Sequence, residues 1–558
     1  YVQEGTHPVT AAMLHRYNLA DVWEAVSDRV PERVAVVCDG AELSYARLEE
    51  RANRLANALL AHGVRAGDHV GVYLVNGPEY FEALLAAFKI RAVPININYR
   101  YVAGELRYLF EDSEIVALIA HRQFSGRVAD VAPTVPAIAT VLSVEDGSGE
   151  PLAAGQLDYE SELAAASAER DFESSVGPRS GDDLYVLYTG GTTGMPKGVV
   201  WRQEDAFFAC IGGGDPMRMS GPVDEPHEVL DRIIDFPFVA FPLAPMMHAA
   251  AQWTSLSWLF CGGSVVMNPG SFDALATWQA IEAHKVSTLI VVGDAMVRPL
   301  IDAWDAHGPF DTSSLFAVGS GGAPLTASLK DRLMEILPTT MVTDGFGSSE
   351  TGAQGSQRLQ PGERSGGSTR FVPMGDTTVV LDDDLAPVVP GSGVVGKVAL
   401  TGRIPLGYYN DPEKSAATFV ESGGKRWVLT GDMATVDEEG TIVLLGRGSQ
   451  VINTGGEKVY PEEVEAALKS HPSVYDAVVA GVPDERFGQR VCAIVAPVAG
   501  ETVTLDELST HCRQSVAGYK VPRELVVVEA VVRSPVGKAD YRWAKRTAFE
   551  ALGLDPDA

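Results

Sequence analysis

The segment from Tyr188 to Gly198, with the sequence Tyr-Thr-Gly-Gly-Thr-Thr-Gly-Met-Pro-Lys-Gly, carries residue types that bind phosphate. Glycines let the main chain approach a ligand closely and adopt positive φ angles. Threonine hydroxyls and free backbone N–H groups donate hydrogen bonds to phosphate oxygens, and a lysine adds a positive point charge. The preceding residues, 183–187, are mostly apolar and predict a buried strand that leads into the loop. The segment therefore predicts a loop that holds the phosphates of a nucleotide.

Two common phosphate-binding motifs do not describe this chain. A P-loop requires a lysine followed by serine or threonine, whereas Lys197 precedes Gly198. The spacing G-x-G-x-x-G occurs at residues 391, 393 and 396, but it leads into 397–400, which has the pattern of a strand. A dinucleotide-binding fingerprint must open a helix, so we interpret this match as a glycine-rich turn. An ordinary strand–turn connection is the alternative for 188–198.

The loop resembles the signature of the acyl-adenylate-forming enzymes, which include acyl-CoA synthetases, adenylation domains of peptide synthetases and luciferases. In that family the loop grips the β- and γ-phosphates of ATP. Where the family usually has a serine, this chain has Gly190, so the threonines must supply the hydroxyl contacts. The resemblance assigns ATP binding to Thr189, Gly190, Gly191, Thr192, Thr193, Gly194 and Lys197, with Thr193 also counted as catalytic.

A second motif of the same family begins at Asp344. The resemblance implies that Phe346 stacks on adenine, that Ser349 contacts the α-phosphate and that Glu350 binds Mg²⁺, a hard cation that prefers oxygen ligands. Asp344 is expected near the adenine amino group. Taken alone, the segment favours a glycine-containing turn with a surface acid, and only its occurrence beside the first loop reverses that preference. The nucleotide residues assigned here are Asp344, Gly345, Phe346, Gly347, Ser348 and Ser349, with Glu350 as catalytic residue and metal ligand.

Further runs resemble the family's adenine-side turn and its ribose site. For the ribose, Asp432 can accept two hydrogen bonds from the hydroxyls, because an ionised carboxylate is only an acceptor, and Arg447 donates. Thr-Gly-Asp is also a common turn sequence. The adenine-side turn comprises Gly321, Gly322, Ala323 and Pro324.

The resemblance places the catalytic lysine of adenylation at Lys538. Negative charge grows on the pentavalent phosphate oxygens and on the leaving pyrophosphate, and an ammonium group stabilises it. In acyl-CoA synthetases a glycine pair in the small domain then swings towards the site for thioester formation. The residues at this turn, expected to accommodate coenzyme A, are Gly455, Gly456, Glu457 and Lys458.

The acyl side of the site has a weaker signal. His248 lies in a segment that resembles the family's substrate gate, and we expect a positioning role for it, with a packed core histidine as the alternative. Small residues at 212–214 and 319–322 would leave room for a large apolar acid. Several runs also resemble actinobacterial ligases for long-chain or steroid side-chain acids. The residues expected beside the acyl group are His248, Gly293, Asp294, Gly319 and Ser320.

Composition excludes several classes of protein. The net charge of −30 argues against nucleic-acid binding, which needs a basic surface. No apolar stretch is long enough to span a membrane, and the first thirty residues have no signal-peptide pattern. The five scattered cysteines form neither a zinc motif nor a disulfide framework. These features predict a cytoplasmic protein with small-molecule partners; they leave its oligomeric state open, a homodimer included.

Alternating helical and strand patterns predict an α/β fold. Residues 43–60 and 81–88 have helical spacing, and 69–74 and 92–97 read as strands, which favours largely parallel sheets covered by helices. Short valine-rich runs in 375–400 predict a β-rich subdomain. We place a domain boundary after Arg447, giving a large domain of residues 1–447 and a small, mobile α+β domain of residues 448–558.

Together, these motifs predict an AMP-forming acyl-CoA synthetase that uses ATP, Mg²⁺ and coenzyme A. A medium- or long-chain acid or a steroid side-chain acid is the expected substrate. Two alternatives stay open. The chain could load a carrier protein, with Asp294 recognising an amino group, or it could be a non-catalytic nucleotide sensor on the same scaffold.

Overall fold

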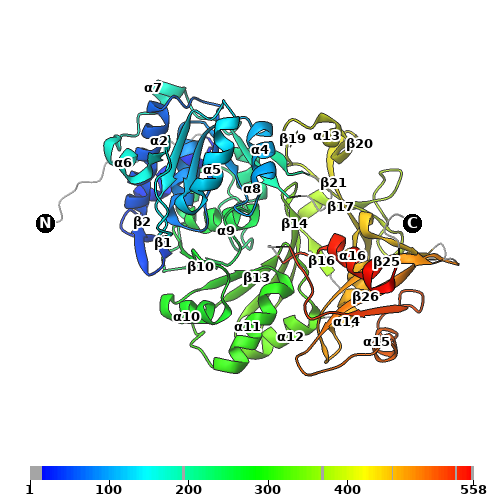
Figure 1. Ribbon diagram of the computed structural model, residues 1–558. Helices are drawn as coiled ribbons and strands as arrows, with labels where there is room; N and C mark the ends of the chain where they lie inside the picture. The colour runs from blue at the N-terminus through cyan, green and yellow to red at the C-terminus, as the bar shows by residue number, and fades with distance from the viewer. Residues whose placement is uncertain are drawn as a thin grey trace.

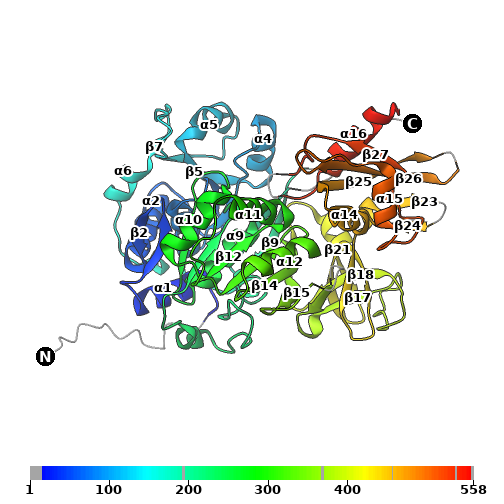
Figure 2. The same cartoon turned by 90° about the horizontal axis from the view of Figure 1, so that it is seen from below.

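The computed structural model describes residues 16–190, 195–365, 370–454, 457–484, 486–534 and 537–554. The blue-to-green part of the chain forms a large α/β body, and the orange-to-red C-terminal part packs against one end of it (Figures 1 and 2). Among the described residues, no helix combines the length and apolar character needed to cross a membrane.

The first sheet is mostly parallel. Strands β3, β4, β5, β6, β7 and β8 pair in parallel, whereas β9 joins β8 and β19 in antiparallel fashion. The strand order is β19 (Gly407–Tyr408), β9 (Lys197–Arg202), β8 (Leu184–Thr189), β4 (Val93–Asn96), β3 (His69–Tyr73), β5 (Ile115–His121), β6 (Thr140–Val144) and β7 (Leu157–Asp158). The phosphate-binding segment thus joins two adjacent antiparallel strands, β8 and β9.

The second sheet changes character along its width. From β1 to β14 the neighbours are parallel apart from the edge hairpin with β2, and beyond β14 all pairs are antiparallel. Its order is β17 (Thr378–Leu381), β18 (Gly396–Thr401), β21 (Lys425–Val436), β22 (Ile442–Arg447), β16 (Arg370–Pro373), β15 (Gly352–Leu359), β14 (Met341–Ser348), β13 (Ala317–Gly321), β12 (Thr288–Val291), β10 (Val239–Pro242), β11 (Ser264–Met267), β1 (Val34–Cys38) and β2 (Ala41–Ser44), with β20 (Phe419–Ser422) paired to β21. The predicted β-rich subdomain is the antiparallel half of this sheet.

Helices pack with both sheets. One large apolar core contains buried residues of both sheets together with those of α1, α2, α3 and α9. The helices of the large body are α1 (Leu19–Arg29), α2 (Tyr45–Ala61), α3 (Pro78–Lys89), α4 (Ala103–Asp112), α5 (Ser125–Val131), α6 (Tyr159–Ala165), α7 (Glu173–Val176), α8 (Gln203–Ala209), α9 (Ala249–Leu259), α10 (Ala274–His284), α11 (Gly293–His307), α12 (Ala327–Ile336) and α13 (Pro412–Thr418). The predicted α/β class is confirmed. The strand expected at 397–400 is β18. Because a dinucleotide-binding fingerprint must open a helix, this strand confirms that the glycines before it do not form one.

The C-terminal part has a separate five-stranded sheet and its own apolar clusters. Pro461 occupies the first turn of α14, where a missing N–H costs nothing, and two glutamates follow it near the positive end of the helix dipole. The elements are β23 (Ile452–Thr454), β24 (Glu457–Val459), α14 (Pro461–Lys469), β25 (Val474–Asp484), β26 (Gly488–Pro497), α15 (Leu505–Cys512), β27 (Glu524–Val527) and α16 (Tyr541–Leu552).

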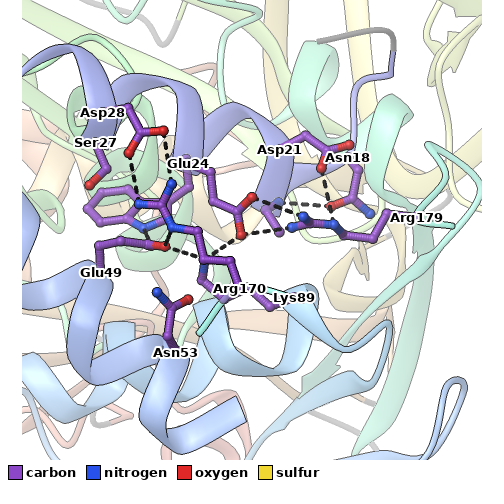
Figure 3. A network of polar contacts seen from close by, with 12 residues as sticks. Asn18, Asp21, Glu24, Ser27, Asp28, Glu49, Asn53, Lys89, Arg170 and Arg179 are labelled. Carbon is purple, nitrogen blue, oxygen red and sulfur yellow. Dashed lines mark hydrogen bonds and ion pairs between the residues drawn. The ribbon is translucent and has the colours of Figure 1, made fainter. Parts of the chain in front are cut away.

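A buried charge network ties α1, α2 and α3 together (Figure 3). The ammonium group of Lys89 is fully buried and lies 2.5 Å from Glu24 and 2.8 Å from Glu49. Arg179 also pairs with Glu24 at 2.9 Å, and Arg170 with Glu49 at 2.7 Å. Burial alone would raise the pKa of Glu24, but Lys89 and Arg179 lower it to about 2. Its contribution to stability is therefore complete above the usual glutamate pKa and is lost as the pH falls towards 2.

We expect Lys89→Met to destabilise the large body by about 3–5 kcal/mol, because it leaves buried carboxylates without their cation. Urea unfolding followed by tryptophan fluorescence measures the change. The matched control is Lys285→Met, since Lys285 forms an exposed ion pair with Asp311. That change should cost far less, because an exposed ion pair is screened by water. Equal losses in the two variants would contradict a stabilising role for the buried network.

Candidate functional site

The residues of the second motif lie at the carboxyl end of β14. Asp344, Gly345, Phe346, Gly347 and Ser348 belong to the strand, and Ser349 and Glu350 form the turn into β15. Parallel pairing with β13 sets Gly345 beside Gly321, so the predicted adenine-side turn adjoins this motif. The carboxyl ends of parallel strands are where α/β proteins bind ligands.

Two of these residues have partners within the protein. The Phe346 ring stacks on Phe371, with centroids 5.2 Å apart. Asp344 is buried, and its carboxylate lies 2.7 Å from the ammonium of Lys330 on α12. Burial raises the pKa of Asp344, and Lys330 opposes that shift. The expected adenine contacts of Phe346 and Asp344 remain predictions.

Tyr408 links the predicted metal ligand to the phosphate-binding loop. Its hydroxyl donates to Glu350 Oε1 at 2.9 Å, and Lys197 Nζ lies 5.5 Å from the centre of its ring. Lys197 also lies 3.3 Å from Asp411. Tyr408 occupies this place because β19 pairs with β9, the strand that Lys197 begins. Oxygen ligands suit Mg²⁺, so an oriented Glu350 carboxylate fits a hard cation.

The phosphate-binding loop is described only at its two ends. Thr189 and Lys197 face each other across the β8–β9 pair, and Gly190 follows directly after Thr189. The side-chain amide of Asn96 donates to the Tyr188 carbonyl at 2.9 Å and fixes the strand before the loop. The remaining predicted phosphate ligands, Gly191, Thr192, Thr193 and Gly194, lie outside the described residues.

The predicted ribose residues stand directly opposite each other. Asp432 on β21 and Arg447 on β22 are register partners, and Arg447 Nε lies 3.4 Å from Asp432 Oδ1. The hydroxyl of Thr430 donates to Asp432 Oδ2 at 2.5 Å. This pairing brings an acceptor and a donor together at one point of the antiparallel subdomain.

Lys538 enters the same region from the C-terminal part. Its loop is held by hydrogen bonds between residues 534 and 538. The surrounding protein lowers the pKa of Lys538, and Arg447 adds to this effect, whereas Glu350 and Asp432 oppose it. The charge of Lys538 is therefore influenced by residues predicted to bind metal and ribose, although they are distant from it in sequence.

The charge of the same lysine influences His248. His248 precedes α9 and is half-buried, and its buried Nε2 has no hydrogen-bond partner among the described residues. Burial lowers the pKa of His248 to about 3, and the positive charges of Lys538 and Arg100 contribute. The imidazole is therefore neutral near pH 7, which suits a wall or gate and does not suit a general acid.

The other predicted acyl-side residues gather at the start of α11 and the end of β13. The hydroxyl of Ser320 accepts from the Gly293 N–H at 3.2 Å. Gly293 has φ +52°, and a Cβ there would lie 2.3 Å from the Pro324 carbonyl oxygen, so only glycine allows this approach. At Gly319 a Cβ would meet only Ile290, at 4.0 Å. The carboxylate of Asp294 is instead bound by Lys469 of α14 at 2.8 Å.

Comparison with known proteins supports the same assignment. The family of AMP-binding enzymes matches residues 23–409, and the C-terminal domain of AMP-binding enzymes matches residues 463–538. The chain belongs to the AMP-binding enzymes.

Two relatives and one solved structure illustrate this membership. The 3-oxocholest-4-en-26-oate–CoA ligase of Rhodococcus rhodochrous is 51% identical over 97% of this chain and 96% of its own length. A medium/long-chain-fatty-acid–CoA/3-oxocholest-4-en-26-oate–CoA ligase of Mycolicibacterium smegmatis is 49% identical over 96% of this chain and 97% of its own length. The crystal structure of the anthranilate CoA ligase AuaEII with anthranoyl-AMP has the same fold, with a TM-score of 0.82, 23% identity and coverage of 97% of this chain and 99% of that one.

The predicted coenzyme A turn of this AMP-binding enzyme is only partly described. Gly455 and Gly456 lie outside the described residues. Glu457 and Lys458 are exposed on β24, at the edge of the small sheet. Their described backbone partners are Thr454 and Asn453 on β23, so their role in thioester formation remains a prediction.

Several supporting residues were missed by sequence reasoning. Tyr408 positions Glu350, Lys330 neutralises Asp344, and Lys469 binds Asp294. The run Tyr408-Tyr-Asn-Asp411, two aromatics beside an acid, was the available signal for the first of these. The two lysines had no local signal, because each lies on an ordinary amphipathic helix.

We expect His248 to stay neutral between about pH 5 and 8, because desolvation of its ring and the nearby positive charges disfavour the imidazolium. NMR of histidine-labelled protein measures this, with the resonance identified by its loss in His248→Gln. A His248 resonance that titrates near 6.5, the value of an unperturbed histidine, would contradict the buried arrangement.

Proposed function

We propose that this AMP-binding enzyme is an AMP-forming acyl-CoA synthetase. A carboxylate oxygen attacks the α-phosphorus of ATP, the bond to pyrophosphate breaks, and an acyl-AMP forms. The sulfur of coenzyme A then attacks the acyl carbon and AMP leaves, which divides one difficult step into two. The geometry that carries the proposal is the pairing of Asp432 with Arg447 across β21 and β22, together with the hydrogen bond from Tyr408, whose ring lies beside Lys197, to Glu350.

Each group has a role that its chemistry suits. Lys538 stabilises the charge that develops around the α-phosphorus, and Lys197 contacts the outer phosphates. Asp432 accepts hydrogen bonds from ribose hydroxyls. Glu350, oriented by Tyr408, would hold Mg²⁺, which would supply further neutralisation of phosphate charge.

For the substrate we propose a steroid side-chain acid or a medium- to long-chain fatty acid. The relatives at 51% and 49% identity bear names that specify such acids. The free space around Gly319 is compatible with a bulky apolar group. The room expected at 212–214 is not there, because a Cβ at Gly212, Gly213 or Gly214 would lie 2.8, 2.6 or 3.1 Å from neighbouring protein atoms. His248 offers a neutral wall to such a group.

The contacts of Asp294 disfavour an amino acid as substrate. Its two oxygens are bound by Lys469 and by the Thr326 N–H. A carboxylate so engaged is a poor partner for a substrate ammonium group. The alternative of carrier-protein loading thereby loses the residue on which its amino-acid recognition depended.

Organisation and location are part of the proposal. We divide the chain into domains 1–447 and 448–558, because the short 3₁₀ turn η5 (Gly448–Gln450) connects the last strand of the large second sheet to the small one. A cytoplasmic location agrees with five unpaired cysteines. We propose no particular oligomeric state.

We expect Lys538→Ala to lose at least about 100-fold in acid-dependent exchange of pyrophosphate into ATP, since it removes the charge that stabilises the transition state. Thioester formation from supplied acyl-AMP and coenzyme A should remain. Lys545→Ala is the control, because Lys545 lies in the same domain over the ring of Phe549. Normal exchange by Lys538→Ala would refute the role given to this lysine.

A panel of acids tests the substrate. With coenzyme A present, pyrophosphate release should rise from acetate to dodecanoate and to a cholestenoic acid, because a large apolar pocket gains binding energy from each buried methylene. Without coenzyme A the release should stop near one equivalent per enzyme. Preference for acetate would reject the proposed substrate class.

A further inference from the structure

Helix α11 presents one polar face to the C-terminal domain. Asp294, Arg298 and Asp302 follow one another at intervals of four residues, so they share a side of the helix. Asp294 pairs with Lys469, Arg298 lies over the ring of Tyr475 at 5.0 Å, and the hydroxyl of Tyr475 reaches Asp302 at 3.4 Å. We call these five residues the α11 seam.

The ion pair between Asp294 and Lys469 is the buried part of the α11 seam. Its nitrogen–oxygen distance is 2.8 Å, and the side chains are only 9% and 5% exposed. Burial alone would raise the pKa of Asp294, but Lys469 and the Thr326 N–H bring it below its usual value. Asp294 is therefore ionised, and its charge is neutralised by the ammonium group of Lys469 and not by water.

A second contact reaches the same turn of α11. Gly537, the residue before Lys538, has φ +74°, and a Cβ built on it would lie 2.6 Å from the Cβ of Ala295. Arg533 donates to the Gly537 carbonyl at 3.2 Å and is itself bound by both oxygens of Asp476. The loop that carries Lys538 therefore rests directly beside the Asp294–Lys469 pair.

We propose that Asp294 and Lys469 are positioning residues for adenylation, which hold the small domain where Lys538 reaches the nucleotide site. This inference rests on the proposed function and deepens it. Neither residue contacts the reacting atoms. They favour one arrangement of the two domains, in which α11 of the large domain, which carries Asp294, contacts α14 of the small domain, which carries Lys469 (Figure 2).

A polar contact suits a reversible arrangement. If the domains separate for the thioester step, both charges return to water and little is lost. If one partner is removed, the other is left buried and uncompensated only when the domains are together. Such a change lowers the population of the adenylating arrangement and leaves the other arrangement unaffected.

The test compares two half-reactions in the full-length protein. We expect Lys469→Met to lower acid-dependent pyrophosphate exchange by at least about tenfold, while thioester formation from supplied acyl-AMP and coenzyme A stays within about twofold. The matched control is Lys520→Met, which removes an ion pair with Glu463 of the same helix but within the small domain. That control should leave both half-reactions near wild type.

A double-mutant cycle tests the coupling itself. Asp294→Asn should also impair exchange selectively, and the double variant with Lys469→Met should lose no more than the worse single variant, because it leaves no lone buried charge. The inference would be overturned if the loss of exchange in the double variant equalled the product of the two single losses. It would also be overturned if each variant lost both half-reactions equally. A wild-type protein that lacks both half-reactions with every acid would instead refute the proposed function, and this inference with it.

Discussion

The structure depends on one electrostatic requirement. A chain of net charge −30 must collect positive charge at the point where phosphates react. Lys538 supplies such a charge from the C-terminal part, and its pKa is influenced by Arg447, Glu350 and Asp432. Lys538 is exposed, so its charge acts strongly on a phosphate only where the bound ligand excludes water.

Two buried lysines show how the protein uses the same interaction for different ends. Lys89 lies between Glu24 and Glu49 inside the large domain, where nothing needs to separate, and its pairs fix α1, α2 and α3 to one another. Lys469 meets Asp294 across a boundary between domains. A charged contact inside one domain favours a unique packing, whereas one between domains can be broken and hydrated at small cost.

The residues predicted to bind the nucleotide are held by strand register more than by side-chain packing. Asp432 faces Arg447 because β21 pairs with β22, Thr189 faces Lys197 because β8 pairs with β9, and Tyr408 reaches Glu350 because β19 adds to β9. Rigid strands place donors and acceptors accurately, and the loops between them remain available for ligand contact.

Many helices, strands and motifs of this protein could be predicted from the amino-acid sequence. The helices at 45–61 and 461–469 and the strands at 69–73 and 184–189 depend on neighbouring residues, so periodicity and spacing predicted them to within a few residues. The motifs expected to bind nucleotide were assigned through their resemblance to a family. The hydrogen-bond and ion-pair partners of the polar side chains could not be predicted from the sequence. Asp294 was predicted to border the acyl group, yet its carboxylate binds Lys469, 175 residues away. Tyr408 and Lys330 also have roles that depend on how separate elements pack together. Local pattern specifies which groups can do chemistry, but only the folded chain decides which charge stands next to which, because pairing between different elements is set by packing and register.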